Sequence, residues 1–320
     1  CRRLDPQGVS GVLMEILLQR LVDGLSYGSV YALIALGLVI VYRGTGHLNF
    51  AQGEMALFST YAVYQFGEWG LPIGLALPLV MIVGFVLGSA TEVLLVRPIA
   101  RKSQFAVFIV TLGVFQFLNW LDGAIWRDQP LPNSAVGSKQ GGFPSLFPNG
   151  KDDFWDVFGA GIKIQSVGVF VLVLVISGLL YLLFNHTRLG LAMRAVASNA
   201  ESSKLVGIRT NVVLMASWGI ATAIGALGGV VFAGINNNVN LGLMFTVFIY
   251  GSAAATLGGF DSPGGAVVGG LAIGVVENLA AGYVDWVGQE MKIAVALVVI
   301  LVVLLVRPSG LFGTAKVERV

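Results

Sequence analysis

The chain has 320 residues, of which 56% are hydrophobic and 11% are charged, and its formal net charge is +2. This composition excludes an ordinary soluble domain with a polar surface and indicates an integral membrane protein. The basic residues are too few and too scattered to indicate a nucleic-acid partner. The single cysteine excludes an intramolecular disulfide and a cysteine-based metal cluster.

Apolar runs long enough to cross a bilayer, about 20 residues each, appear in the first half of the chain. Residues 24–42 form the first expected span and contain no charge. The glycine-rich polar passage GTGHLNFAQGE (44–54) follows, and then an apolar run, 55–66, that is too short to span by itself. Further spans are expected at 71–96 and 105–121.

The middle of the chain changes character and then returns to apolar runs. Residues 122–166 carry charges, prolines and glycines, so we expect them to lie outside the bilayer. The elements expected after them are, in order, a span at 164–184, a polar segment at 188–208, two helices within the charge-free stretch 210–260 joined by an asparagine-rich turn, a second broken passage LGGFDSPGG (257–265), and apolar runs at 266–282 and 293–306. This order predicts an all-α polytopic bundle of about 8–10 transmembrane helices forming one domain over 1–320.

Positive charges predict the orientation of the bundle, because Lys and Arg favour short cytoplasmic loops. Three positives lie in residues 97–102, four in 188–209 and three in the tail after 306. Simple alternation of the spans places all three on one side. We therefore expect these segments and the C-terminus in the cytoplasm, and residues 122–166 outside it.

The polar segment 188–208 has the features of a short capped helix. Ser198 and Glu201 have the spacing of a capping box, and Gly207 stands where a left-handed cap would end the helix, which predicts a helix over 199–206. A docking surface and a solvated loop both remain open on this pattern. An apolar stripe that would extend the helix toward the N-terminus consists of Leu189, Met193, Val196 and Ala200.

The two broken passages share a layout, in which a glycine-rich polar break separates an apolar run from a helix rich in small residues. Transporters use such breaks to expose backbone groups to a solute in a cavity. The alternative is that the glycines allow close helix packing and the polar side chains only cap half-helices. Candidate pathway residues are Asn49, Phe50, Gln52, Gly53, Glu54, Gly258, Gly259, Gly264 and Gly265.

Two acids, Glu92 and Glu277, are set within apolar runs, where they could line a pathway or pair with a neighbouring helix. Phosphate-binding, zinc-protease and nucleophile-elbow motifs do not occur in the sequence, and the two histidines, His47 and His186, lie far apart. We therefore assign no catalytic residue, no metal ligand and no cofactor site to this chain.

Four motifs, HLNFAQGEMALF, RLGLAMRAVASNAESSKLVGI, LGGFDSPGGAVVGGLAIGVVENL and RPSGLFG, occur in this order. Together they resemble the permease subunits of bacterial branched-chain amino acid ABC importers, of the LivH type, over about residues 16–320. Gln52 stands where that family commonly has a histidine.

The resemblance implies a type II ABC importer permease in the bacterial inner membrane. Its expected partners are a second, LivM-type permease subunit, two ATP-binding subunits that hold ATP and Mg, a periplasmic solute-binding protein and the lipid bilayer. It also implies that residues 188–208 form the cytoplasmic coupling loop. Its candidate ATPase-coupling residues are Arg188, Gly190, Arg194, Ala197, Ser198, Ala200, Glu201, Lys204 and Gly207.

Three other functions remain open at this point. A urea or short-amide permease would share the architecture, so the solute is not fixed by these motifs. An ion-coupled secondary transporter would explain the broken helices, and a membrane enzyme would explain buried acids.

Overall fold

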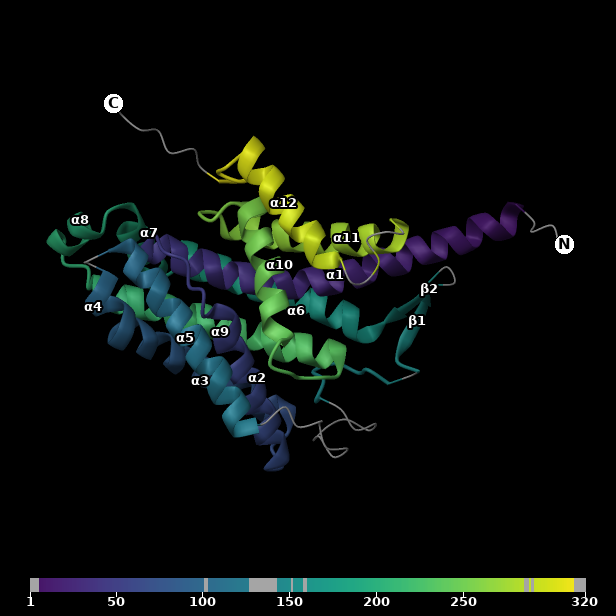
Figure 1. The fold of residues 1–320 in the computed structure, drawn as a ribbon, viewed down its shortest axis with the longest axis horizontal. Helices are drawn as coiled ribbons and strands as arrows, with labels where there is room; N and C mark the ends of the chain where they lie inside the picture. Colours follow the sequence, from purple (N-terminus) through teal and green to yellow (C-terminus); the bar gives the residue numbers. More distant parts are fainter. Residues whose placement is uncertain are drawn as a thin grey trace.

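The computed structural model describes residues 6–100, 103–126, 143–150, 152–157, 160–284, 288 and 291–313. The chain is a bundle of helices with one small hairpin (Figure 1). The elements are α1 (Pro6–Thr45), α2 (Gln52–Glu68), α3 (Ile73–Thr91), the π-helical turn η1 (Glu92–Val96), α4 (Arg97–Ala100), α5 (Gln104–Trp126), β1 (Phe154–Val157), β2 (Ala160–Lys163), α6 (Ile164–His186), α7 (Arg188–Ser198), α8 (Ala200–Leu205), α9 (Thr210–Asn236), α10 (Leu243–Gly258), α11 (Pro263–Tyr283) and α12 (Lys292–Val306).

Six of the described helices are long and apolar enough to cross a membrane: α1, α3 with its extension to Ala100, α5, α6, α9 and α11. α10 and α12 are shorter apolar helices, and α2 has 17 residues. The all-α polytopic class is therefore confirmed. The expected number of about 8–10 transmembrane helices depends on how the three shorter helices sit in the bilayer and stays a prediction.

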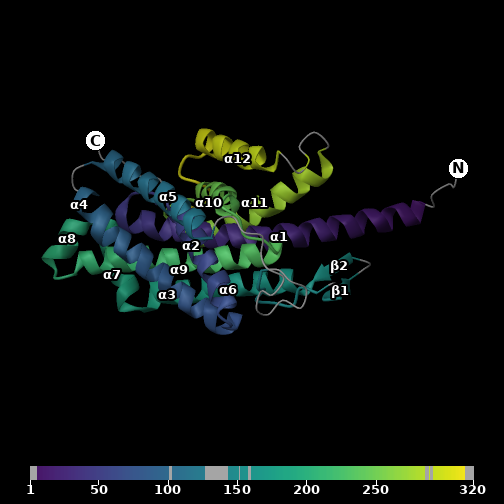
Figure 2. The same cartoon turned by 60° about the horizontal axis from the view of Figure 1, so that its bottom comes forward.

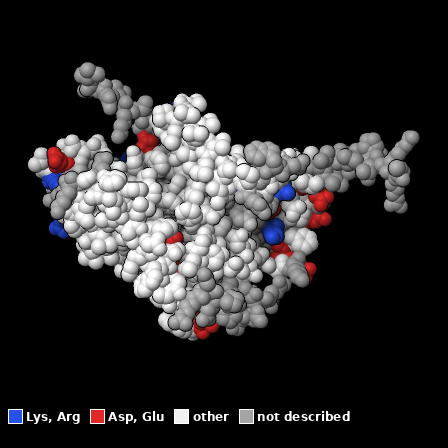
Figure 3. All heavy atoms as spheres, viewed as in Figure 1, with Lys and Arg blue, Asp and Glu red and all other residues white. Residues whose placement is uncertain are grey.

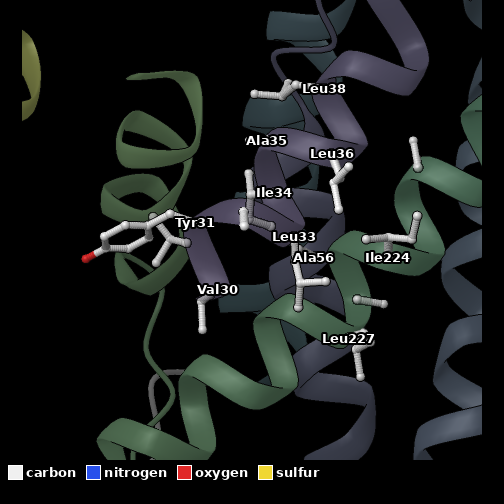
Figure 4. Close-up of a cluster of buried hydrophobic side chains, with 14 of the residues drawn as sticks. Val30, Tyr31, Leu33, Ile34, Ala35, Leu36, Leu38, Ala56, Ile224 and Leu227 are labelled. Carbon is white, nitrogen blue, oxygen red and sulfur yellow. The ribbon is translucent and has the colours of Figure 1, made fainter. Parts of the chain in front are cut away.

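α1 is the central axis of the bundle. It packs against α9, α10 and α6, and most extensively against α11. Nearly all of its membrane-spanning part is buried by the other helices, whereas α3, α5 and α6 leave most of their side chains on the outside. The buried face joins α1 to its neighbours through Leu33 and Ile34, which lie beside Ala56 of α2 and Leu227 of α9 (Figure 4).

Small residues allow α1 and α11 to approach closely. Gly24 and Gly28 on α1 face Gly270 and Gly274 on α11, at four-residue spacing on both helices. A Cβ added at Gly28 would lie 2.7 Å from the carbonyl oxygen of Gly270, and one at Gly274 would lie 2.3 Å from that of Gly24. In membranes such small-residue faces let backbones pack where lipid gives no hydrophobic drive.

The β-hairpin and the α7–α8 segment lie at opposite ends of the molecule in both views (Figures 1 and 2). α6 connects them directly, and its 23 residues measure about 34 Å, roughly the thickness of a bilayer's apolar core. On the face drawn in Figure 3, charged residues gather mainly at these two ends, and only isolated acidic groups show on the surface between them. The structure thus separates the expected outer segment from the expected coupling segment.

Segments that carry basic residues meet at the α7–α8 end. Arg97 of α4 donates a hydrogen bond to the carbonyl oxygen of Asn211, at the start of α9, at 3.0 Å. The chain after α12 folds back onto the second broken passage, where Leu311 N–H donates to the Leu257 carbonyl oxygen at 2.8 Å. The described parts of all three positive segments therefore lie at one end, as the sequence predicts.

Several expected boundaries were wrong. α1 begins well before residue 24 and tolerates Arg20 and Asp23 in its span. α5 continues to Trp126, so Asp122 is a fully buried helix residue rather than the start of an exposed loop. The hairpin β1–β2 within 122–166 was not expected, and residues 127–142 of that segment lie outside the described residues. The predicted boundaries were wrong because we expected charged residues to end each span, whereas in the structure neighbouring helices cover these polar groups.

The turn between α9 and α10 agrees with its prediction. Asn237 adopts φ +52°, a left-handed conformation that asparagine tolerates better than most residues, and it ends α9.

Candidate functional site

The candidate coupling segment consists of α7 and α8, which together make a bent platform at one end of the bundle. Thr187 starts α7, because its hydroxyl accepts a hydrogen bond from Gly190 N–H at 3.0 Å. Met193 and Val196 are buried against the bundle, and Leu189 packs partly behind them. The predicted apolar stripe is therefore confirmed for these three residues, whereas Ala200 is exposed and belongs to the next helix.

Gly190 holds α7 tightly against the end of α6. A Cβ at this position would lie 2.2 Å from the Leu183 carbonyl oxygen and 2.5 Å from the Phe184 Cα, so any larger residue must displace backbone. Gly190 is thus a structural member of the predicted coupling set, buried beneath the platform.

The capping box predicted for α8 was wrong. Ser198 is the last residue of α7, and Asn199 caps α8 by accepting a hydrogen bond from Ser202 N–H at 2.9 Å. Asparagine is as good a helix cap as serine, so the sequence spacing does not distinguish Ser198 from the adjacent Asn199. The predicted end is confirmed: Gly207 adopts φ +86°, and Ile208 N–H donates to the Ser203 carbonyl oxygen at 3.0 Å.

The outer face of the platform mixes charge with exposed apolar side chains. Leu205 is 89% exposed and Val206 is 76% exposed, at the tip of α8. Sequence reasoning missed both, because they fall outside the helical stripe; their place directly before a glycine cap was the available signal. The predicted coupling residues that are also exposed are Arg188, Arg194, Ala197, Ser198, Ala200, Glu201, Lys204 and Gly207, of which Arg194 borders a cavity between α1, α6 and α7.

The first broken passage runs from the end of α1 back into the bundle, where Asn49, Ala51 and Gln52 are fully buried. The Asn49 side-chain carbonyl accepts from Ala51 N–H at 3.0 Å, and its amide donates to the Gln52 carbonyl oxygen Oε1 at 3.3 Å. Irregular backbone at membrane depth needs such partners because lipid supplies none.

Gln52 fills a notch between α1 and α9. Its amide Nε2 donates to the Ala221 carbonyl oxygen at 2.9 Å. A Cβ at Gly37 or at Gly225 would lie 2.7 or 2.6 Å from that same nitrogen, so both glycines make room for it. Gln52 therefore joins helices in this structure instead of facing an open cavity.

Glu54 points to the other side of α2, toward α5. Its Oε2 accepts from the Asn119 amide at 3.2 Å, and Asn119 also donates to the Leu241 carbonyl oxygen at 3.3 Å. Asp122 lies close enough to Glu54 for their charges to interact, and neither of its carboxyl oxygens has a hydrogen-bond partner among the described residues. This buried acidic pair was missed, because Asp122 looked like a loop residue in the sequence.

The second broken passage packs against the end of the chain. A Cβ at Gly258 would lie 2.1 Å from the Gly265 carbonyl oxygen, and one at Gly259, which has φ +98°, would lie 2.7 Å from Gly313 N. Ser262 caps α11 by accepting from Gly265 N–H at 3.0 Å. Gly264 differs from its neighbours, since a Cβ there meets nothing within 4 Å.

The structure does not bring the two passages to one cavity within the described part of this chain. A Cβ at Gly53 would lie 3.0 Å from Phe248 Cβ of α10, and the Phe50 ring packs 6.1 Å from the Phe248 ring. Gly264 instead borders a cavity between α1, α6 and α7. The glycines of both passages thus serve close packing, which is the alternative weighed above, and their role in a pathway stays a prediction.

The two intramembrane acids both have partners. Arg97 Nε donates to Glu92 Oε1 at 3.1 Å, and the π-helical turn between them places residues five apart on one face. Glu277 accepts from the Tyr31 hydroxyl at 2.8 Å and lies 3.6 Å from Lys292 Nζ, so it ties α11 to α1 and α12. For both acids the contacts favour pairing with neighbours.

A family model described as the permease component of branched-chain amino acid transport systems matches residues 20–305, which includes α1, both broken passages and the α7–α8 platform. The chain belongs to this family. The permease is 32% identical to the high-affinity branched-chain amino acid transport system permease protein BraD of Pseudomonas aeruginosa, over 95% of this chain and 98% of BraD. It is 30% identical to LivH of Escherichia coli strain K12, over 95% of this chain and 97% of LivH.

A permease named for another solute matches part of the chain. The permease is 25% identical to the nucleoside ABC transporter permease protein NupB of Lactococcus lactis, over 66% of this chain and 58% of NupB. Membership in the family makes the permease a membrane-spanning transport subunit of an ABC transporter. This decides against the ion-coupled transporter and the membrane enzyme.

Proposed function

We propose that the permease carries branched-chain or related hydrophobic amino acids across the bacterial inner membrane, as one of two permease subunits of an ABC importer. The second subunit is of the LivM type, two ATP-binding subunits hydrolyse ATP with Mg, and a periplasmic solute-binding protein delivers the solute. The family match and the relatives named for this transport support the solute class.

In this proposal the α7–α8 platform docks into an ATP-binding subunit on the cytoplasmic side, and the C-terminus lies on the same side. The observation that carries it is the pair of exposed apolar side chains, Leu205 and Val206, at the tip of the capped helix α8, which follows the helix that Gly190 packs tightly against α6. Side chains so exposed cost solvation free energy unless a partner covers them. The charged residues around them, Glu201 and Lys204, suit the polar rim of such an interface.

The test is co-purification of the ATP-binding subunits with a tagged permease carrying Leu205→Glu. We expect the bound ATPase to fall roughly 10-fold or more, because one buried leucine contributes about 1.5–3 kcal/mol. Phe154→Glu, which changes an exposed apolar residue of the hairpin at the other end, is the matched control and should retain the ATPase. Full retention in Leu205→Glu would refute docking at this tip.

The solute is tested separately by uptake of radiolabelled leucine into cells that express the complete transporter. We expect excess isoleucine and valine to compete and excess urea or acetamide to have no effect. Uptake of urea or a short amide instead of leucine would favour the alternative permease of the same architecture.

A further inference from the structure

A cavity of about 320 Å³ lies between α1, α6, α7 and the first turn of α11. It is large enough to hold part of a small ligand. The cavity belongs neither to the outer face of the platform nor to the buried Asn49–Gln52 cluster, so neither of the sites described above accounts for it.

One end of the cavity is positively charged. Arg43 comes from the last turn of α1 and lies with its guanidinium carbon 5.7 Å from the centre of the Phe184 ring. Arg194 comes from α7, lines the same cavity and is close enough to repel Arg43, while Asp261 attracts it. Arg194 has no ion pair within the residues that the structure describes. Arg43 therefore lies near one carboxylate and one like charge.

A third positive element comes from the backbone. Gly264 lines the cavity in the first turn of α11, where backbone N–H groups carry partial positive charge. Because Gly264 has no side chain and nothing lies within 4 Å of where a Cβ would be, an anion can reach this helix end.

The cavity becomes apolar away from the helix ends. Leu36 lies seven residues before Arg43 on α1, about 10 Å deeper along the axis. Leu180 on α6 and Val267 on α11 line it one turn inward from Phe184 and Pro263. Tyr181, which is largely exposed, stands at its edge. The α1 wall therefore changes from cationic to aliphatic with depth, and α6 and α11 add Leu180 and Val267 beside it, together with the Ser177 hydroxyl of α6.

We propose that this cavity binds an anionic phospholipid, with the phosphate between Arg43, Arg194 and the start of α11 and an acyl chain along Leu36, Leu180 and Val267. A small soluble anion would use only the charged end, and a neutral lipid would leave the positive charge of Arg194 unneutralised beside Arg43. A lipid phosphate bound here bridges α1 to α7, so its occupancy stiffens the attachment of the platform to the bundle.

The experiment uses the complete transporter, with its partner subunits, reconstituted into nanodiscs of equal parts phosphatidylcholine and phosphatidylglycerol. Native mass spectrometry then counts the lipids that remain bound after release from the disc. We expect the wild type to retain phosphatidylglycerol in preference to phosphatidylcholine. Arg194→Gln, an exposed position on α7, is expected to weaken this retention by about 5-fold.

Gly264→Phe tests the cavity independently, because it fills the space while leaving both arginines in place, and it should also lose the lipid. Arg209→Gln is the matched control: it removes an exposed arginine at the same end that does not line the cavity, and it should retain phosphatidylglycerol as the wild type does. Equal retention of the two lipids by the wild type, or unchanged retention in both cavity variants, would overturn the proposal. Displacement by glycerol phosphate as effective as by a short-chain phosphatidylglycerol would show a soluble-anion site instead and would equally overturn it.

Discussion

The amide nitrogen of Gln52 lies 2.9 Å from the carbonyl oxygen of Ala221, and this hydrogen bond joins the broken passage after α1 to the middle of α9. Gly225, one turn further along α9, leaves room for the same amide. The Ala221 carbonyl also accepts the helical hydrogen bond of α9, so Gln52 supplies a second donor that links the two segments.

We predict that Gln52→Ala lowers the stability of the assembled permease by about 1–3 kcal/mol, because it empties the notch and removes the hydrogen bonds to the Ala221 carbonyl oxygen and from the Asn49 amide. Gly225→Ala should also destabilise the protein, since its Cβ would lie 2.6 Å from Gln52 Nε2. In a Gln52→Ala background, however, Gly225→Ala should cost little. A double-mutant cycle of thermal unfolding in detergent measures this coupling, and additive effects would show that the notch is not filled by Gln52.

Alanine should be tolerated at Gly264 but not at the adjacent Gly265. Gly265→Ala places a Cβ 2.3 Å from the Gly258 carbonyl oxygen, so we expect loss of folded permease from the membrane. Gly264→Ala meets open space and should accumulate at the wild-type level. Quantitative immunoblots of membrane fractions compare them. Equal accumulation of the two variants would contradict the close packing of the second broken passage.

Because Asp122 and Glu54 are two acids buried side by side, we predict that removing the Asp122 carboxyl group does not destabilise the permease. Asp122 has no hydrogen-bond partner among the described residues and interacts with the like charge of Glu54. Asp122→Asn keeps the shape and removes a buried ionisable group, so thermal stability should be unchanged or higher. Asp122→Lys is the counterpart that introduces a longer side chain into the same site and should destabilise it. A marked loss of stability in Asp122→Asn would indicate that the carboxylate has a cationic partner.

The orientation can be tested with cysteines at the two ends of α6, in a background where Cys1 is replaced by serine. A cysteine at Trp155, in the hairpin, should react with a membrane-impermeant thiol reagent added to spheroplasts. A cysteine at Ser202, in α8, should react only after the membrane is permeabilised. Both side chains are exposed, so burial does not explain a difference. The reverse labelling pattern would overturn the predicted cytoplasmic position of the platform.

The sequence by itself determined the class of the protein and most of its helices. A membrane span requires an unbroken apolar run, and a left-handed helix cap favours glycine. Both are local sequence features, so α6, α9, α11 and the cap at Gly207 could be predicted from them. The four family motifs are also local sequence patterns, so they can be recognised without knowledge of the tertiary contacts.

Only the tertiary structure showed which partners the polar groups inside the bundle have. Gln52, Glu54 and Asp122 are polar in the sequence, and nothing local distinguishes a pathway residue from one that binds a neighbouring helix. Their roles depend on partners far along the chain, such as Ala221 for Gln52 and Asn119 for Glu54. In the same way, Gly264 and Gly265 are adjacent glycines that the sequence does not distinguish. In the structure Gly265 packs against the backbone of Gly258, whereas Gly264 faces open space. Such pairings are set by how the helices pack, which the one-dimensional pattern of hydrophobicity does not encode.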